Sequence, residues 1–301
     1  MSEKLIYVYC VADKEPEIKA AVGGLTDNLH FISHSGIYAV VSMVEEDEFS
    51  EENLKKNLAD INWIEKKARV HEGVIEGIMK SSVVLPLKFA TLFNTEENLK
   101  AILEEKSSEF KENLEYLRDK EEWGVKIYCD IDKLKENITR VNGDILKMTK
   151  EIDSGSAGKS FFLKKKKEEM LTIAVNKKIQ EYGQDSFNRL REQSINAKIN
   201  KLLPEEVTEK KEKMILNSAF LVEKDKVNAF NSTVDILKKQ YKEIGILFDC
   251  TGPWPAYNFT VGSGLVSILG TSAICERSKG TVLGTSLAGS DEAILEENKN
   301  E

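Results

Sequence analysis

The order in which strand-like and helical segments alternate constrains the fold of this chain more than any other sequence feature. Short runs rich in β-branched and aromatic residues predict four strands in the first 90 residues, at 5–12, 29–33, 37–44 and 81–89. Residues 16–21 predict one or two helical turns, and apolar residues three and four apart from Leu54 to Ile78 predict helix. The resulting order, β-α-β-β-α-β, is the ferredoxin-like split βαβ pattern.

The second half of the chain repeats this order with an oversized first helix. Strands are predicted at 123–130, 206–210, 214–222 and 244–250, and helices at 131–152, 161–203 and 226–241. The sequence therefore predicts an α+β protein with two ferredoxin-like domains. Their expected bounds are 1–92 and 121–259, with a helical linker over 93–120 and a flexible Gly/Ser-rich tail with an acidic end over 260–301.

The charge pattern restricts the partners. The chain has 51 acidic and 43 basic residues, a formal charge of −8, and half of this excess lies in the last eleven residues. We expect no nucleic-acid partner, because no basic face with interleaved aromatic residues is evident. The uncharged run from Cys250 to Cys275 contains two prolines and several glycines, so no membrane span is expected. No signal peptide is evident at the N-terminus, and a cytoplasmic location is expected.

Few residues suggest a metal, cofactor or nucleotide site. None of the four cysteines forms a CxxC pair, and His30 and His34 lie in a predicted strand and turn, so neither a metal site nor a cofactor is expected. The loop 158–160 reads Gly-Lys-Ser, like the end of a phosphate-binding P-loop, but Asp153 stands where that motif needs its first glycine. Nucleotide binding there is the alternative hypothesis. Lys164–Lys167 are expected to form a solvated helix face, with Glu168 and Glu169 as partners.

The strongest local signal is the segment that follows the last predicted strand. It reads Gly-Pro-Trp-Pro-Ala-Tyr-Asn-Phe, and its two prolines favour a stiff, extended backbone. Aromatic side chains on such a backbone suit either packing within the protein or capture of a partner. The candidates for partner binding or domain locking are Gly252, Pro253, Trp254, Pro255, Tyr257 and Phe259.

Several blocks together resemble the gas vesicle protein F/L family. They are LIYVYCV, HEGVIEGIMKSSVVLPLKFATLF, EEWGVKIYCD, SGSAGKSFFLKKK, LNSAFLV and LFDCTGPWPAYNF, in the order of the family from about residue 5 to 259. The chain departs from the family at Lys88 and Ala90, where Arg and Gly are usual, and at Ala256, where a second Pro is usual. The tail from Thr260 lies outside the family pattern.

The resemblance implies a non-enzymatic accessory protein that is needed for gas vesicle assembly. It also implies a cytoplasmic, vesicle-associated protein whose partners are the hydrophobic shell protein or other vesicle accessory proteins. A very hydrophobic shell subunit needs a soluble escort, and a highly charged protein with one uncharged segment suits that role. The competing hypothesis is a nucleotide-dependent assembly factor that uses the loop at 158–160.

Overall fold

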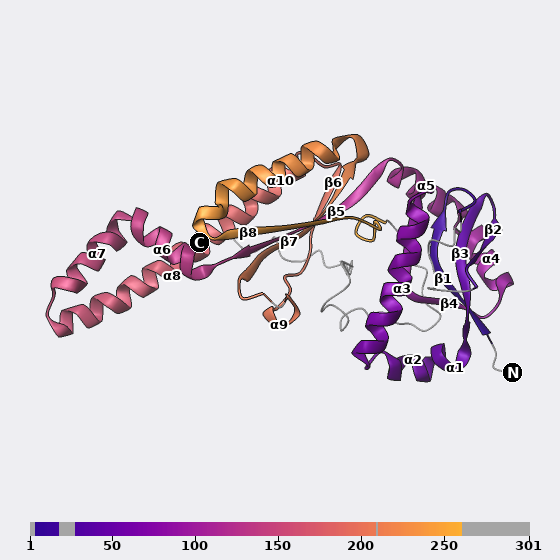
Figure 1. Ribbon diagram of the computed structural model, residues 1–301, viewed down its shortest axis with the longest axis horizontal. Helices are drawn as coiled ribbons and strands as arrows, with labels where there is room; N and C mark the ends of the chain where they lie inside the picture. The colour runs from indigo at the N-terminus through magenta and orange to yellow at the C-terminus, as the bar shows by residue number, and fades with distance from the viewer. Residues whose placement is uncertain (1–3, 18–27, 209, 261–301) are drawn as a thin grey trace, which may run out of the picture.

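The computed structural model describes residues 4–17, 28–208 and 210–260, and it contains two four-stranded antiparallel sheets (Figure 1). The first sheet has the order β2-β3-β1-β4, and the second has the order β6-β7-β5-β8. These two orders are equivalent, with the first strand of each set in the interior beside the third, as in the ferredoxin-like fold. The strands are β1 (Lys4–Ala12), β2 (His30–His34), β3 (Ile37–Glu45), β4 (Val84–Phe93), β5 (Lys120–Cys129), β6 (Asn196–Ile199), β7 (Lys213–Glu223) and β8 (Ile246–Trp254).

Three helices pack on one face of the first sheet: α1 (Glu46–Phe49), α2 (Glu51–Asn57) and α3 (Ile61–Met79). The apolar repeat that predicted helix from Leu54 to Ile78 is divided between α2 and α3. The division falls at Asp60, whose carboxylate accepts hydrogen bonds from the backbone N–H groups of Asn62 and Trp63 and so begins a new helix. The strands predicted at 29–33 and 37–44 pair as a hairpin of β2 and β3, with Ser35 and Gly36 at φ +50° and +74° in its turn.

Two further helices, α4 (Glu96–Glu105) and α5 (Ser107–Leu117), cover the opposite face of the first sheet. Their buried side chains are Leu99, Leu103, Phe110, Leu114 and Leu117, and all five belong to one apolar core with Ile6 and Val8 of β1. Residues 93–120, predicted as a linker, therefore also form part of the first sheet's core. Ala219 and Leu221 of β7 join the same core, so the two sheets share apolar contacts.

The second sheet is covered on one face by α8 (Ala157–Arg191) and α10 (Val227–Tyr241). The helix predicted over 131–152 is divided at Asn142, which caps a second helix through the N–H groups of Asp144 and Ile145. The result is α6 (Ile131–Val141) followed by α7 (Gly143–Ser154), and α7 packs along the first half of α8 as an arm that projects away from the sheet (Figure 1). Short 3-10 helices lie at Lys224–Lys226 and Lys242–Ile244.

Two predictions in the second half are wrong. The long helix ends at Arg191 instead of residue 203, and the edge strand β6 follows it. Ile195, Ile199 and Leu202 have helical spacing, but all three are exposed, so this spacing marks no buried helix face. The strand predicted at 206–210 is instead the short helix α9 (Glu205–Thr208), because Pro204 and the two glutamates after it favour a helix start. The helical turns predicted at 16–21 and the tail beyond Thr260 lie almost wholly outside the described residues.

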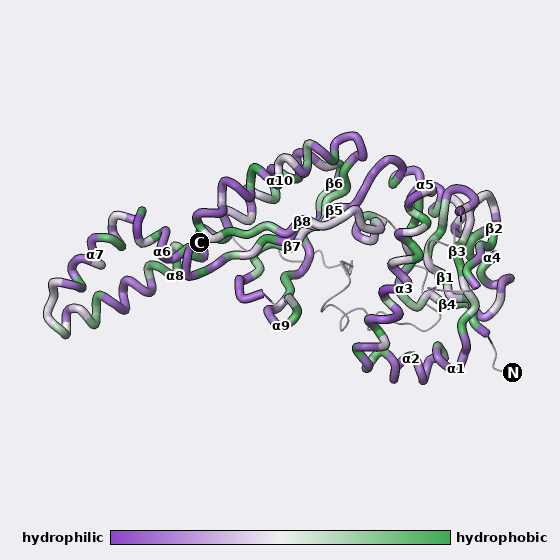
Figure 2. Tube along the Cα trace, in the orientation of Figure 1, coloured by the Kyte–Doolittle hydropathy of each residue, from purple (hydrophilic) through white to green (hydrophobic). Residues whose placement is uncertain are grey.

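Hydropathy follows this architecture. Apolar residues concentrate along the strands, whereas the exposed helix α2 is largely hydrophilic (Figure 2). Within the part of the chain that the structure describes, every helix is too short or too polar to span a lipid bilayer.

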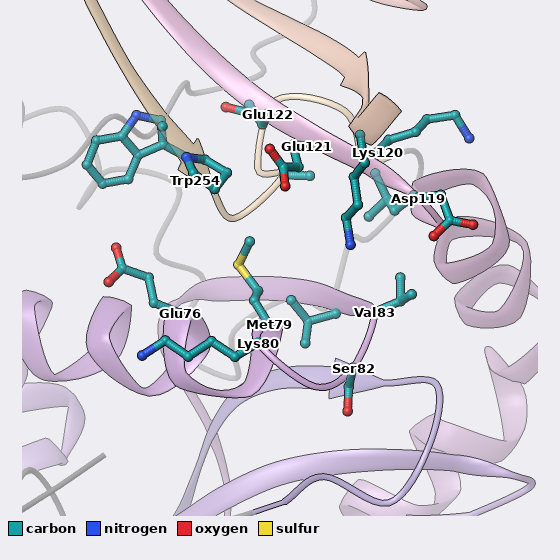
Figure 3. Close-up of a pocket in the computed structure, with 16 residues that line it drawn as sticks. Glu76, Met79, Lys80, Ser82, Val83, Asp119, Lys120, Glu121, Glu122 and Trp254 are labelled. Atoms are coloured by element: carbon teal, nitrogen blue, oxygen red, sulfur yellow. The ribbon is translucent and has the colours of Figure 1, made fainter. Parts of the chain in front are cut away.

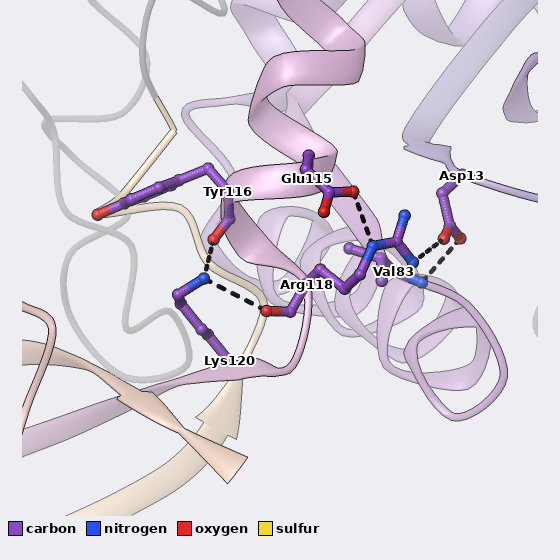
Figure 4. A network of polar contacts seen from close by, with 6 residues as sticks. All are labelled: Asp13, Val83, Glu115, Tyr116, Arg118 and Lys120. Carbon is purple, nitrogen blue, oxygen red and sulfur yellow. Dashed lines mark hydrogen bonds and ion pairs between the residues drawn. The ribbon is translucent and has the colours of Figure 1, made fainter.

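A polar network fixes the turn that leads from α5 into the second sheet (Figure 4). The Arg118 guanidinium lies 3.0 Å from Asp13 Oδ2 and 2.8 Å from Glu115 Oε2. Asp13 also accepts a hydrogen bond of 3.0 Å from the backbone N–H of Val83, the residue just before β4. The end of β1, the start of β4 and the start of β5 are thereby held together.

Candidate functional site

The segment predicted to bind a partner or to lock the domains begins inside a strand. β8 extends to Trp254, and Glu122 of β5 pairs with Trp254 across the sheet. The Gly252–Pro253 peptide bond is cis, and Gly252 has φ +146°. A Cβ atom at Gly252 would lie 3.0 Å from the Glu122 carbonyl oxygen and 3.1 Å from the Trp123 ring, so only glycine fits. We call residues 252–259 the junction segment.

Beyond Trp254, the junction segment leaves the second sheet and packs against the first. Ala256 and Phe259 are buried in the core between the first sheet and the α4–α5 helices. Tyr257 packs instead with the cluster on the α3 side of the same sheet. The segment therefore contacts apolar clusters on both faces of the first sheet, although it follows a strand of the second.

Tyr257 reaches a buried histidine. Its hydroxyl lies 3.1 Å from Nε2 of His71, a residue of α3 that is 2% exposed. The same Nε2 lies 3.1 Å from the carbonyl oxygen of Leu87 in β4, and Nδ1 lies 3.0 Å from the hydroxyl of Tyr7 in β1. A β-bulge in β1 between Val8 and Cys10 lies beside this site.

The hydrogen bonds of this network define the protonation of His71. The Tyr7 oxygen accepts the backbone N–H of Ala90 at 3.0 Å, so its own proton is directed to Nδ1 of His71. Nε2 must then carry the hydrogen, because the Leu87 carbonyl can only accept. Burial lowers the pKa of His71 to about 4, and the bond to Leu87 opposes that shift. His71 is therefore neutral at physiological pH and holds α3, β1, β4 and the junction segment together.

A second polar contact involves a buried carboxylate. Glu122 is 2% exposed, and it accepts hydrogen bonds from both the backbone N–H and the side-chain amide of Asn258. Burial raises the pKa of Glu122 to about 7, while the two bonds from Asn258 and the charge of Lys198 lower it. The Lys198 ammonium also donates to the Asn258 carbonyl oxygen at 3.1 Å. Strands β5 and β6 are both tied to the junction segment through Asn258.

A cleft of about 540 Å³ opens between the two sheets beside the junction segment (Figure 3). Trp254 lies on one side with Glu121, and Glu76 and Met79 of α3, with Lys80 directly after that helix, face them (Figure 3). Gly252 and Pro253 also line this cleft and are exposed. The sequence candidates therefore divide into two groups: Gly252, Pro253 and Trp254 line the cleft, whereas Pro255, Tyr257 and Phe259 pack between the sheets.

The loop considered for nucleotide binding has no P-loop geometry. Residues 158–160 form the first turn of α8, and the preceding element is helix α7 instead of a strand. The Lys159 ammonium lies 3.5 Å from the Glu151 carboxylate, and the Ser160 hydroxyl donates to the Ile152 carbonyl oxygen at 2.8 Å. Both side chains thus interact with α7, and no phosphate cradle is formed.

Among the described residues, no group of three or more His, Cys, Asp or Glu side chains is arranged to hold a metal ion. The polar contacts of the junction are made by His71, Glu122 and Asn258, which sequence reasoning did not place at this site. Glu122 lies in β5, but the strand was predicted to start one residue later, at Trp123. Nothing in the local sequence pattern therefore marked Glu122 as buried. Asn258 lies inside the predicted segment, but the sequence pattern marks only the glycine, prolines and aromatic residues around it as candidates.

Comparisons with known proteins agree with this architecture. A family model described as "Gas vesicle synthesis protein GvpL/GvpF" matches residues 5–261. Gas vesicle protein L of Streptomyces sp. (strain CB03234) is 32% identical over 133 residues, which cover 43% of this chain and about half (49%) of that protein. Gas vesicle protein F of the same organism is 24% identical over 262 residues, covering 84% of this chain and 98% of that protein.

Solved structures show the same fold. The crystal structure of GvpF from Anabaena sp. PCC7120 matches with a TM-score of 0.60 and 17% identity, over 85% of this chain and 96% of that one. GvpF from Microcystis aeruginosa matches with a TM-score of 0.57 and 17% identity, over 85% of this chain and 98% of that one. The match of the family model over most of the chain is decisive. The chain belongs to the GvpL/GvpF family of gas vesicle synthesis proteins.

Proposed function

We propose that this protein is a non-enzymatic accessory factor of gas vesicle assembly, which acts in the cytoplasm by binding the hydrophobic shell protein or another vesicle protein. The observation that carries the proposal is the cleft beside the junction segment. Trp254 and Met79 supply apolar surface there, and charged side chains such as Glu76, Lys80 and Glu121 surround them. An apolar centre with a charged rim is the usual composition of a protein-binding site.

The junction segment has two roles in this proposal. Its buried part, Pro255–Phe259, holds the two sheets in a fixed relation, and its exposed part, Gly252–Trp254, offers the binding surface. Trp254 is suited to this role because its ring is only half-buried, and its indole N–H is already satisfied by Thr251 Oγ1 at 3.0 Å. A partner can therefore cover the ring without leaving a polar group unpaired.

Co-expression with each vesicle protein, followed by affinity capture, tests the proposal. We expect Trp254→Ala to reduce capture of one vesicle protein at least tenfold, as for an interface anchor worth about 2 kcal/mol. The matched control is Ile236→Ala, which truncates an exposed apolar residue of α10 that does not line the cleft. Unchanged capture by Trp254→Ala, with wild-type unfolding behaviour, would show that the cleft is not the binding site.

A further inference from the structure

The arm formed by α7 and the first half of α8 carries an exposed apolar surface next to a basic one. Phe161 and Phe162, in the second turn of α8, are 76% and 67% exposed. Two adjacent phenylalanines in this state are rare on a surface that makes no contacts. Lys164–Lys167 follow directly.

The four lysines are not neutralised by their neighbours. Glu168 and Glu169 were expected to pair with them, yet within the described residues no carboxylate lies within ion-pair distance of any of the four. The lack of ion pairs follows from the order of the residues along the helix, because a glutamate four residues after a lysine pairs less well than one four residues before it.

Helix α8 places the two phenylalanines and the lysines on the same side. Residues four apart on a helix are neighbours, so Phe161 lies beside Lys165 and Phe162 beside Lys166. The surface therefore presents two rings, each with an ammonium group one turn away. Its complementary ligand is a short apolar segment flanked by carboxylates, because apolar side chains cover the rings and carboxylates pair with the lysines.

This chain contains such a segment. Residues 291–297 read Asp-Glu-Ala-Ile-Leu-Glu-Glu, with three apolar residues between two pairs of carboxylates. Thirty residues separate it from Thr260, the last described residue. A chain of that length spans about 30 Å as a coil and about 100 Å when extended. Asn258 contacts Lys198, just beyond the end of α8, and Phe161 lies 30 residues, about 45 Å, back along that helix, so the tether has to extend beyond its coil length but can reach the arm of the same chain.

We propose that residues 291–297 bind the arm surface of the same chain, formed by Phe161, Phe162 and Lys164–Lys167. The apolar residues of the segment cover the two rings, and its carboxylates pair with the lysines.

Zero-length carbodiimide crosslinking of the full chain tests this proposal, because it joins lysines to carboxylates that are in contact. An equal mixture of unlabelled and ¹⁵N-labelled protein distinguishes links within one chain from links between chains. We expect links from Lys164–Lys167 to residues 291–297 within one chain, and a several-fold loss of these links between 50 and 500 mM NaCl. Lys238 and Lys239 of α10 serve as reference lysines and should give no such links.

Variants separate the apolar and the ionic parts. Phe161→Ser with Phe162→Ser should reduce the links several-fold, and Ile236→Ser, an exposed residue of another helix, should leave them unchanged. Because these side chains are exposed, none of the substitutions threatens the fold. The combined change Lys164→Glu, Lys165→Glu, Lys166→Glu and Lys167→Glu should abolish the links. Adding Asp291→Lys, Glu292→Lys, Glu296→Lys and Glu297→Lys should restore them with the charges reversed.

Three results would overturn the proposal. Absence of the links in the wild-type chain would exclude the contact. Links that join labelled to unlabelled chains would assign the surface to a second copy. Sedimentation of the full chain with vesicles of anionic lipid, lost on removal of the two rings and unaffected by the changes in 291–297, would assign it to a membrane.

Discussion

Replacement of Asn258 by alanine tests whether the buried carboxylate at the junction is stabilised as an ion. In the wild-type protein, two N–H donors of Asn258 reach the two oxygens of Glu122. The substitution removes the side-chain donor and keeps the backbone donor. One oxygen of a buried carboxylate then loses its partner in the described structure, and the cost depends on whether Glu122 is charged.

The magnitude follows from the protonation of Glu122. Its pKa is raised from 4.5 to about 7, so at pH 6 the folded protein holds the proton and at pH 8.5 it does not. A hydrogen bond to a charged group contributes about 1.5–3 kcal/mol, and one to a neutral group about 0.5–1.5 kcal/mol. Asn258→Ala should therefore cost about 1 kcal/mol more at pH 8.5 than at pH 6.

The raised pKa of Glu122 also determines how the stability of the wild-type protein changes with pH. Because the folded state binds the Glu122 proton more tightly than the unfolded state does, this group lowers stability as pH rises from about 4.5 to about 7. The full effect is about 3 kcal/mol. Glu72, whose pKa burial and Glu76 raise to about 7, acts in the same direction. His71 acts in the opposite direction, since its lowered pKa of about 4 costs stability as pH falls from 6.5 to 4.

Urea unfolding of wild type and Asn258→Ala at pH 6 and pH 8.5 measures this difference, and the contributions of Glu72 and His71 cancel in the comparison. Asn217→Ala is the matched control, because the Asn217 amide donates to the neutral Lys201 carbonyl at an exposed site and its cost should not vary with pH. Glu122→Gln should flatten the wild-type pH dependence. An equal cost of Asn258→Ala at both pH values, or a larger cost at pH 6, would refute the ionic contact.

Three further changes probe the rest of the junction, each measured by urea unfolding. Phe259→Ala empties a buried site between the sheets and should cost about 3–5 kcal/mol; a cost below 1 kcal/mol would mean that the two sheets do not share this core. Gly252→Ala brings a methyl group against the Trp123 ring at a positive φ and should cost at least about 1–3 kcal/mol, whereas a neutral effect would contradict the backbone described here. Tyr257→Phe should cost only about 0.5–1.5 kcal/mol, because His71 keeps its bond to the Leu87 carbonyl, and a larger loss would assign the hydroxyl a further partner.

Local patterns predicted most of the fold, and they failed where local and tertiary signals differ. Apart from its first residue, β1 is a continuous apolar run, and β7 is apolar except for Asn217, Ser218 and its two ends, so composition alone identifies both strands. The edge strand β6 has four residues and little burial, and its pairing with β7 decides its conformation. The breaks at Asp60 and Asn142 depend on capping side chains inside continuous apolar repeats, and a repeat by itself does not show where a helix restarts.

The candidate site was predictable in position but not in its contacts. The two prolines and three aromatic residues marked the junction segment, yet only the structure brings Tyr257 to His71, which lies 186 positions away in the sequence. Ala90 is a second residue whose structural role local sequence patterns do not show. Ala90 has φ +58°, a conformation that favours glycine, and its N–H bonds the Tyr7 hydroxyl that orients His71.

The junction also explains why the two sheets behave as one unit in this structure. Ala256 and Phe259 complete a core that already contains residues of both sheets, and Asn258 joins them to the buried carboxylate of β5. Ala256, Asn258 and Phe259 all follow the last strand, so this shared core is not closed until the chain has passed residue 259. Loss of the junction segment should therefore expose apolar residues of both sheets in this shared core. Replacement of Trp254 should not do so, because its ring lines the cleft and is not part of the core.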